Sequence, residues 1–237
     1  MVQGHARPPR HECRSRCRDR WDDGRVNRER TAGAQRRRPV QRRSVERFER
    51  LLDACAEVLE DAGLVALTTK EVARRAGVPI GTLYQFFSDK EGLLGALAAR
   101  NLELFLGRVA ARLERERPGD VRGAVDAAVE EFVAMRRTVT GFGVVDFGAA
   151  GQDHALDPAL DNNTAVAGRL RELLADLVGV PDDQELEIAL RVALECADGV
   201  LNLAFRTDPR GDPQLIAECK RVLTSYLSDR IGAPRTG

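Results

Sequence analysis

Hydroxyl and amide side chains suited to contacting DNA stand close together in one short stretch, at Thr82, Tyr84 and Gln85. The Gln85 amide can donate and accept at the same time, which matches the edge that adenine presents in the major groove. The hydroxyls of Thr82 and Tyr84 can donate to phosphate oxygens, and such contacts position a protein on a duplex. The residues just before them, which we also expect at the DNA surface, are Pro79, Ile80 and Gly81.

The segment around these residues has the pattern of two short helices joined by a turn. Thr68 and Glu71 form a capping box that begins the first helix, and Gly77 can end it with a positive φ. Pro79 suits the first turn of the second helix. The apolar residues of that helix are three and four apart and so share one side: Ile80, Leu83 and Phe87. The polar side chains then face away, which predicts a helix-turn-helix.

Two helix starts and a basic run add candidate phosphate contacts. Thr69 opens one helix, and a second capping box, Ser88 with Glu91, predicts another helix from about Lys90. Backbone N–H groups at helix starts favour anions, so we expect Thr69 and Lys90 near phosphate. The basic run before the first helix could enter a minor groove or be a solvated linker, and it ends with Arg42 and Arg43.

This stretch resembles the DNA-binding segment of TetR-family transcriptional regulators over about 50 residues, 44–94. The residues that carry the resemblance are Thr69, Ala76-Gly77-Val78, Gly81-Thr82-Leu83-Tyr84, Phe86-Phe87 and Lys90-Glu91. Phe86 departs from the family, which often has Tyr or His there. The resemblance implies phosphate contacts at the matching positions, a C-terminal domain that binds a small-molecule effector, and a four-helix dimer interface made by the last two helices of each copy.

Helical periodicity continues along the chain and predicts an all-α protein of about nine helices. A three-helix helix-turn-helix domain at 41–105 follows an Arg-rich tail, 1–40, that we expect to be disordered, and a larger helical ligand-binding and dimerisation domain occupies 106–237. The predicted helices outside the helix-turn-helix are 44–62, 90–116, 121–137, a short one within 138–151, 158–177, 182–205 and 213–231. The helix at 182–205 is apolar on most sides, which indicates burial or an oligomer interface.

Candidate effector-binding residues come from two patterns in the C-terminal half. Three aromatic residues could form an apolar wall: Phe132, Phe142 and Phe147. Glu195 and Asp198 lie within the apolar helix at 182–205, where a charge is costly unless it is paired or used. Pairing of Glu195 with Arg191, four residues earlier, is the structural alternative for the first of them.

Composition narrows the function classes. Residues 1–43 hold 14 Arg and five acidic residues, so this part carries +9 and the rest −9, which suits a front end that meets phosphate. Five Cys are odd in number and widely spaced, which predicts no disulfide framework and a reducing cytoplasm. No apolar run could span a membrane. His11, Cys13 and Cys17 lack the fourth ligand of a zinc site, so we expect no metal and no cofactor.

These patterns predict a DNA-binding transcriptional regulator, not an enzyme, because no catalytic motif is present. One helix-turn-helix reads few base pairs, so a homodimer on an inverted-repeat operator is expected physically. The family resemblance adds repression relieved by an effector. A ligand-responsive activator, and a helical partner-binding module without DNA binding, are the alternatives.

Overall fold

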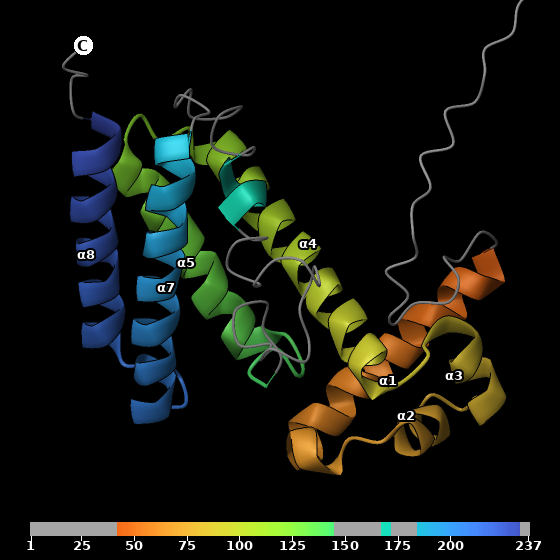
Figure 1. Ribbon diagram of the computed structural model, residues 1–237. Helices are drawn as coiled ribbons and strands as arrows, with labels where there is room; N and C mark the ends of the chain where they lie inside the picture. The colour runs from red at the N-terminus through yellow and green to blue at the C-terminus, as the bar shows by residue number, and fades with distance from the viewer. Residues whose placement is uncertain (1–41, 145–166, 172–183, 233–237) are drawn as a thin grey trace, which may run out of the picture. The chain divides into compact units, whose positions relative to one another are not determined.

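The computed structural model describes residues 42–144, 167–171 and 184–232, and these belong to one compact unit of the chain. All of the regular secondary structure in these ranges is helical, which confirms the all-α prediction (Figure 1). Residues 167–171 are also helical, within the predicted helix 158–177. The other elements are α1 (Arg42–Ala66), α2 (Thr69–Arg75), α3 (Ile80–Phe86), α4 (Lys90–Glu116), α5 (Val121–Thr138), α7 (Gln184–Thr207) and α8 (Pro213–Gly232).

Most helix bounds agree with the sequence prediction to within two residues, and two places differ. The helical backbone breaks at Gly63, as predicted, because Gly63 has φ 72°, but a short helical stretch that was not predicted follows it and carries α1 to Ala66. The short helix predicted within 138–151 is absent from its described part, because residues 139–144 form turns. Residues 145–166 and 172–183 lie outside the described residues, as does the tail with His11, Cys13 and Cys17.

Side chains at the helix starts explain where several helices begin. The Thr68 hydroxyl accepts from the Glu71 N–H at 3.1 Å, as predicted. At α4, however, the predicted Ser88 cap is wrong: the Asp89 carboxylate accepts from the Gly92 N–H at 2.8 Å. Asp89 is directly before the first helical residue, so its carboxylate reaches an N–H three residues on, and its charge also favours the positive end of the helix dipole. Asp120 caps α5 in the same way.

The first hydrophobic cluster, which we name the N-terminal cluster, joins α1, α2, α3 and the start of α4. An apolar stripe of α1 contributes to it, and Cys55 is fully buried there. Burial raises the pKa of the Cys55 thiol to about 12, so this cysteine is a core residue. The remaining large members are Leu51, Leu52, Val58, Leu59, Leu67, Val72, Leu83, Phe86, Phe87, Leu93, Leu94 and Leu97.

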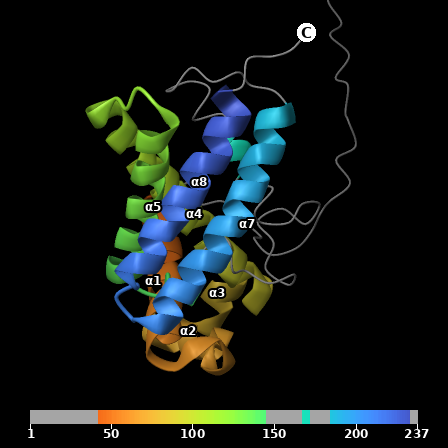
Figure 2. The same ribbon diagram turned by 90° about the vertical axis from the view of Figure 1, so that its left-hand side faces the viewer.

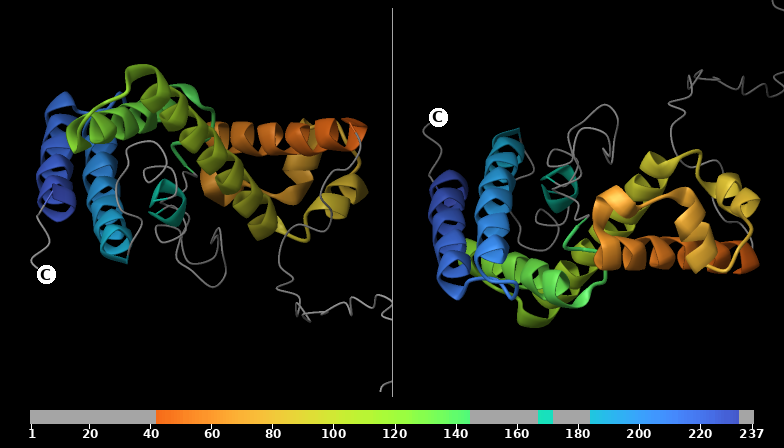
Figure 3. Two further views of the ribbon diagram at one scale, coloured as in Figure 1. Left: turned by 90° about the horizontal axis from the view of Figure 1, so that it is seen from above. Right: turned by 90° about the horizontal axis from the view of Figure 1, so that it is seen from below.

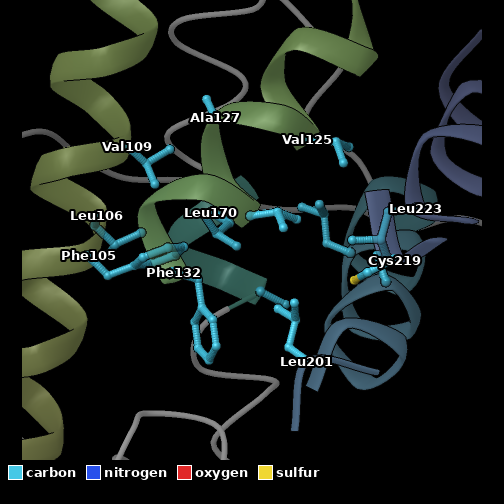
Figure 4. Close-up of a cluster of buried hydrophobic side chains, with 14 of the residues drawn as sticks. Phe105, Leu106, Val109, Val125, Ala127, Phe132, Leu170, Leu201, Cys219 and Leu223 are labelled. Atoms are coloured by element: carbon cyan, nitrogen blue, oxygen red, sulfur yellow. The ribbon is translucent and has the colours of Figure 1, made fainter. Parts of the chain in front are cut away.

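The second cluster, the C-terminal cluster, lies among α4, α5, α7, α8 and residues 167–171. Figure 2 shows α7 and α8 side by side, and Figure 4 shows side chains from these helices meeting around Phe132. Both Phe132 and Val133 of α5 are buried in it. Residues of α4 take part in both clusters: Leu93, Leu94, Leu97 and Ala98 in the first, and Leu102, Phe105, Leu106, Val109 and Leu113 in the second. The domain boundary at residue 105 stays a prediction.

Candidate nucleic-acid interface

The turn between α2 and α3 has the geometry of a helix-turn-helix. Gly77 has φ 64°, a conformation that glycine adopts without strain, and it follows the α2 cap residue Ala76. The Val78 N–H donates to the Ala73 carbonyl at 3.0 Å and holds the turn closed. From α1, the Arg50 guanidinium donates to the Ala76 carbonyl at 2.8 Å, so a third helix fixes the turn.

The buried and exposed sides of α3 differ from the prediction at one residue. Leu83 and Phe87 are buried as expected, but Ile80 is 41% exposed and Phe86 is buried in its place. Helical spacing fails here because α3 is only seven residues long and Phe87, its C-cap, has extended backbone angles. The chain therefore turns Phe87 into the core after the helix has ended, while Ile80 stays on the surface.

Three phenylalanine side chains pack together on the buried side of α3. Phe48 of α1 packs against Phe86 and Phe87, with ring centroids 5.8 and 5.3 Å apart. Phe86, which stands where related sequences often have Tyr or His, is thus a packing residue. Because the aromatic residues at the end of α3 are anchored from behind, the residues on its other side are presented on a fixed backbone.

The exposed side of α3 carries the predicted DNA-contacting groups. Gly81, Tyr84 and Gln85 are exposed, and Thr82 is half-buried. The Tyr84 hydroxyl lies 3.2 Å from the Thr69 hydroxyl at the start of α2, so the structure brings together two residues that the sequence placed on separate helices. Pro79 is exposed and directly precedes the helix as its N-cap residue.

Lys90 has a contact that the sequence does not reveal. Its ammonium donates to the Leu64 carbonyl at 2.9 Å, which ties the start of α4 to the end of α1. An ammonium has three donors, so this bond leaves two for a phosphate. At both helix starts one capping side chain accepts from the third N–H of the helix, and the first N–H groups, those of Thr69 and Lys90, have no acceptor within their own helix.

Ion pairs divide the cations of α1–α4 up to Arg100 into two groups. Four are within 4 Å of carboxylates: Arg42, Arg74, Arg75 and Arg100. In particular, Arg42 is paired with Glu46 at 3.1 Å, and the hydrogen bond from Arg74 holds the pKa of Glu71 below its usual range. The remaining cations of α1–α4 up to Arg100 have no such carboxylate within the described part of the chain: Arg43, Arg47, Arg50, Lys70 and Lys90.

Three of these cations were missed as DNA-contacting candidates: Arg47, Arg50 and Lys70. A signal for two of them was present, because Arg43, Arg47 and Arg50 are four and three residues apart and share one side of α1. Lys70 directly follows Thr69 at the start of α2 and is exposed. An unneutralised cation is the kind of group that releases counterions when it meets a phosphate.

The candidate effector residues are only partly brought together. Phe132 and Phe142 are buried with their ring centroids 5.4 Å apart, whereas Phe147 lies outside the described residues. Glu195 is exposed, so its charge remains in water. Asp198 is half-buried and accepts from the Asn202 amide at 2.8 Å. Burial, and then the neighbouring Glu195 carboxylate, raise the pKa of Asp198.

A groove of about 530 Å³ lies elsewhere, between α4, α5 and α8. Its charged lining is largely neutralised internally, since Arg112 pairs with Glu131 at 3.6 Å and Lys220 pairs with Glu130 at 2.6 Å. None of the candidate effector residues lines it. The predicted effector site and this groove are therefore separate places on the molecule.

Both α7 and α8 expose apolar residues. Ile188, Val192 and Leu203 of α7 are 53%, 41% and 42% exposed, and Val222 of α8 is 48% exposed. The three α7 residues recur along one side of the helix, which is the pattern of a helix packed on both sides. An apolar surface of this kind on paired helices is typical of an oligomer interface.

Sequence profiles of two related families match most of the described chain. The profile described as "Bacterial regulatory proteins, tetR family" matches residues 51–97, and "Tetracyclin repressor-like, C-terminal domain" matches residues 119–231. The first range contains α2, the turn and α3, together with every buried residue of the N-terminal cluster except Ala98. The second begins just before α5 and reaches into the end of α8.

Two curated relatives match over shorter stretches. The HTH-type transcriptional repressor KstR of Mycolicibacterium smegmatis is 31% identical over 120 residues, which are 46% of this chain and 57% of the relative. The uncharacterized HTH-type transcriptional regulator YvdT of Bacillus subtilis is 25% identical over 111 residues, 47% of this chain and 56% of the relative. The chain thus spans a little over half the length of these relatives.

One solved structure matches over nearly its whole length. The TetR-family transcriptional regulator from Streptomyces coelicolor is 42% identical, with 78% of this chain and 99% of that chain covered and a TM-score of 0.69. A helix-turn-helix with a buried aromatic support, an all-helical C-terminal part and this likeness lead to one conclusion. The chain belongs to the TetR family of transcriptional regulators.

Proposed function

We propose that the chain binds an inverted-repeat DNA operator as a homodimer and represses transcription until a small-molecule effector releases it. The observation that carries the proposal is the exposed side of α3, where Tyr84 and Gln85 stand on a helix anchored from behind by Phe86 and Phe87. Gln85 is the proposed base contact and Tyr84 a phosphate contact.

Phosphate binding is proposed for the cations and hydroxyls that flank α3. The Thr69 and Tyr84 hydroxyls lie together, and Lys90 and Lys70 are cations without a carboxylate partner among the described residues. On α1, Arg43 and Arg47 extend this set, whereas Arg42 is already paired with Glu46. The contacts to phosphate would hold the recognition helix in the major groove, and the contacts to bases would choose the sequence.

Homodimerisation is proposed through the exposed apolar side of α7 and α8. Two helices from each copy would bury Ile188, Val192, Leu203 and Val222 in a four-helix interface. A two-fold axis there would present two copies of α3 to half-sites about 34 Å apart on one side of the duplex. Such a protein regulates transcription by binding DNA in the cytoplasm. The proposal requires neither a catalytic reaction nor a cofactor.

The effector site is proposed within residues 106–237, between α5 and α7. Phe132 and Phe142 supply an apolar wall, and Asp198 is the polar candidate because it is half-buried and close enough to Arg136 for the two charges to interact. Arg136 itself stacks over the Phe205 ring at 4.7 Å. The effector would weaken DNA binding only by its preference for the conformation that does not fit the operator.

The experiment is selection of bound DNA from a random pool by the purified full chain at one stated salt concentration. We expect enrichment of an inverted repeat, bound by a dimer, because each copy supplies one recognition helix. Gln85→Ala should relax the preference at one position of each half-site. Glu57→Ala, an exposed α1 substitution within the same domain, is the matched control and should select the wild-type sequence.

A folded helical dimer that enriches no sequence would refute the DNA-binding proposal.

If an operator is selected, a reporter assay separates repression from activation. The operator is placed either upstream of a reporter promoter or overlapping it. Repression predicts lower expression only when the operator overlaps the promoter.

A further inference from the structure

The turn that follows α5 contacts α1 over a sequence separation of 81 residues. The Gly141 N–H donates to the Glu60 carboxylate at 2.8 Å. A Cβ atom on Gly141 would lie 2.7 Å from the carbonyl oxygen and 2.8 Å from the Cα of Ala56, so the two backbones touch and leave no space for a side chain. Gly141 also has φ 72°, which favours glycine again.

The turn is held firmly on its other side by the C-terminal cluster. Phe142 is fully buried against Phe132, and the Arg136 guanidinium donates to the Gly143 carbonyl at 3.1 Å. Two residues after Phe142, Val144 packs against the N-terminal cluster instead. One short turn, residues 139–144, thus contacts both clusters. Figure 3 shows the course of the chain at the end of α5, where this turn begins.

Among the residues that the structure describes, α4 also connects these clusters, because it runs through both. A single long helix bends, so it fixes an angle poorly by itself. The contact between the turn at 139–144 and α1 is a second attachment beside α4. Because two separate contacts join α1 to the C-terminal cluster, the angle between them is fixed more firmly than by α4 alone. Glu60 and Gly141 therefore act on α1–α3 as positioning residues and need not touch DNA.

We propose that the contact of Gly141 with Glu60 and Ala56 sets the spacing between half-sites that the dimer accepts. This inference rests on the proposed function of a DNA-binding homodimer. One added base pair moves the second half-site by about 3.4 Å along the duplex and about 35° around it. Two firmly held recognition helices discriminate against that change, whereas two loosely held ones follow it.

The experiment compares binding to the selected operator with binding to versions whose spacer is longer or shorter by one base pair. Glu60→Ala removes the acceptor, Glu60→Gln keeps an acceptor oxygen, and Gly141→Ala forces the backbones apart. Glu57→Ala removes the same charge one turn earlier on α1, from an exposed residue, and is the matched control.

We expect Glu60→Ala and Gly141→Ala to reduce the affinity ratio between the best and the altered spacing by about two- to tenfold, the usual effect of one hydrogen bond on an equilibrium. Glu60→Gln and Glu57→Ala should keep the wild-type ratio. Binding to a DNA with a single half-site should be equal in all five proteins, which separates positioning from damage to the helix-turn-helix. The inference would be overturned if Glu60→Ala and Gly141→Ala both kept the wild-type spacing preference. It would also be overturned if these variants lost as much affinity for the single half-site as for the full operator.

A second measurement does not depend on DNA. Amide hydrogen exchange of residues 139–144 should be faster in Glu60→Ala than in the wild type and in Glu57→Ala, because the Gly141 N–H loses its acceptor. Equal protection in all three proteins would overturn the second attachment itself. Wild-type protein that selects no DNA would refute the proposed function, and the exchange result would still decide whether the attachment exists.

Discussion

Replacing Lys90 by Gln should lower the salt dependence of operator binding while leaving the fold intact. The Lys90 ammonium has no carboxylate within 4 Å among the described residues, and its bond to the Leu64 carbonyl holds it at the start of α4. A glutamine amide can still donate to that carbonyl but carries no charge. The substitution therefore separates the phosphate contact from the structural bond.

The magnitude follows from counterion release. Each phosphate neutralised on duplex DNA contributes about 0.9 to the slope of log affinity against log salt, so two copies of Lys90 contribute about 1.8. Between about 50 and 200 mM salt, the wild type should lose roughly twelvefold more affinity than Lys90→Gln. Lys90→Ala should show the same slope and in addition lose about 1 kcal/mol of stability, because the Leu64 carbonyl loses its donor.

The assay is fluorescence anisotropy of a labelled operator, titrated at several salt concentrations. Arg74→Gln is the matched control, because Arg74 is exposed on α2 but already bonded to Glu71 at 2.6 and 2.8 Å. Its slope should remain close to that of the wild type. A wild-type slope in Lys90→Gln, or a larger slope change in Arg74→Gln, would refute the division of cations into paired and DNA-contacting groups.

Three further predictions concern assembly, stability and pH. Leu203→Glu should convert the dimer to a monomer in sedimentation velocity, whereas Leu104→Glu on α4, a residue of similar exposure, should remain dimeric. Phe87→Ala should destabilise the chain by about 3–5 kcal/mol in chemical unfolding, since Phe87 is fully buried, and a loss under 1 kcal/mol would argue against its place in the core. Asp198→Asn should stabilise the chain at neutral pH, because burial raises the pKa of this carboxyl and its charged form is therefore unfavourable in the folded state. That gain should disappear as the pH falls below the ordinary aspartate pKa, where the carboxyl is protonated in folded and unfolded chains alike; a gain that persists at low pH would contradict the reasoning.

Local signals in the sequence predicted much of this fold. The bounds of α4 agree at both ends: a capping residue does precede Lys90, although it is Asp89 and not the predicted Ser88, and Pro118-Gly119-Asp120 stops the helix and caps the next one. The position of Gly77 at the turn is likewise a local consequence of its φ angle. Short-range spacing and backbone preference decide such features, so a single sequence contains them.

Contacts between distant residues were beyond that reasoning. The bonds from Lys90 to Leu64 and from Arg50 to Ala76 each join residues 26 apart, and periodicity does not reveal which surface groups will meet. The error at Ile80 has a different cause, because α3 ends before the spacing that pairs it with Phe87 is complete. The candidate effector residues were the least accurate part of the prediction, because a buried site depends on how several helices pack together.

The continuous course of α4 through both clusters makes the protein sensitive to insertions and deletions near Asn101, a buried residue of this helix. One residue added between Ala98 and Leu102 would rotate one end of the helix by about 100° and move it by about 1.5 Å relative to the other. Two apolar faces that now lie on their own clusters would then point in incompatible directions. An insertion of about 7 or 11 residues comes within about 20° of whole turns and restores the direction of both faces, but it lengthens the helix by about 10 or 16 Å and separates Gly141 from Glu60 on α1. Length changes in this family member should therefore accumulate in its loops.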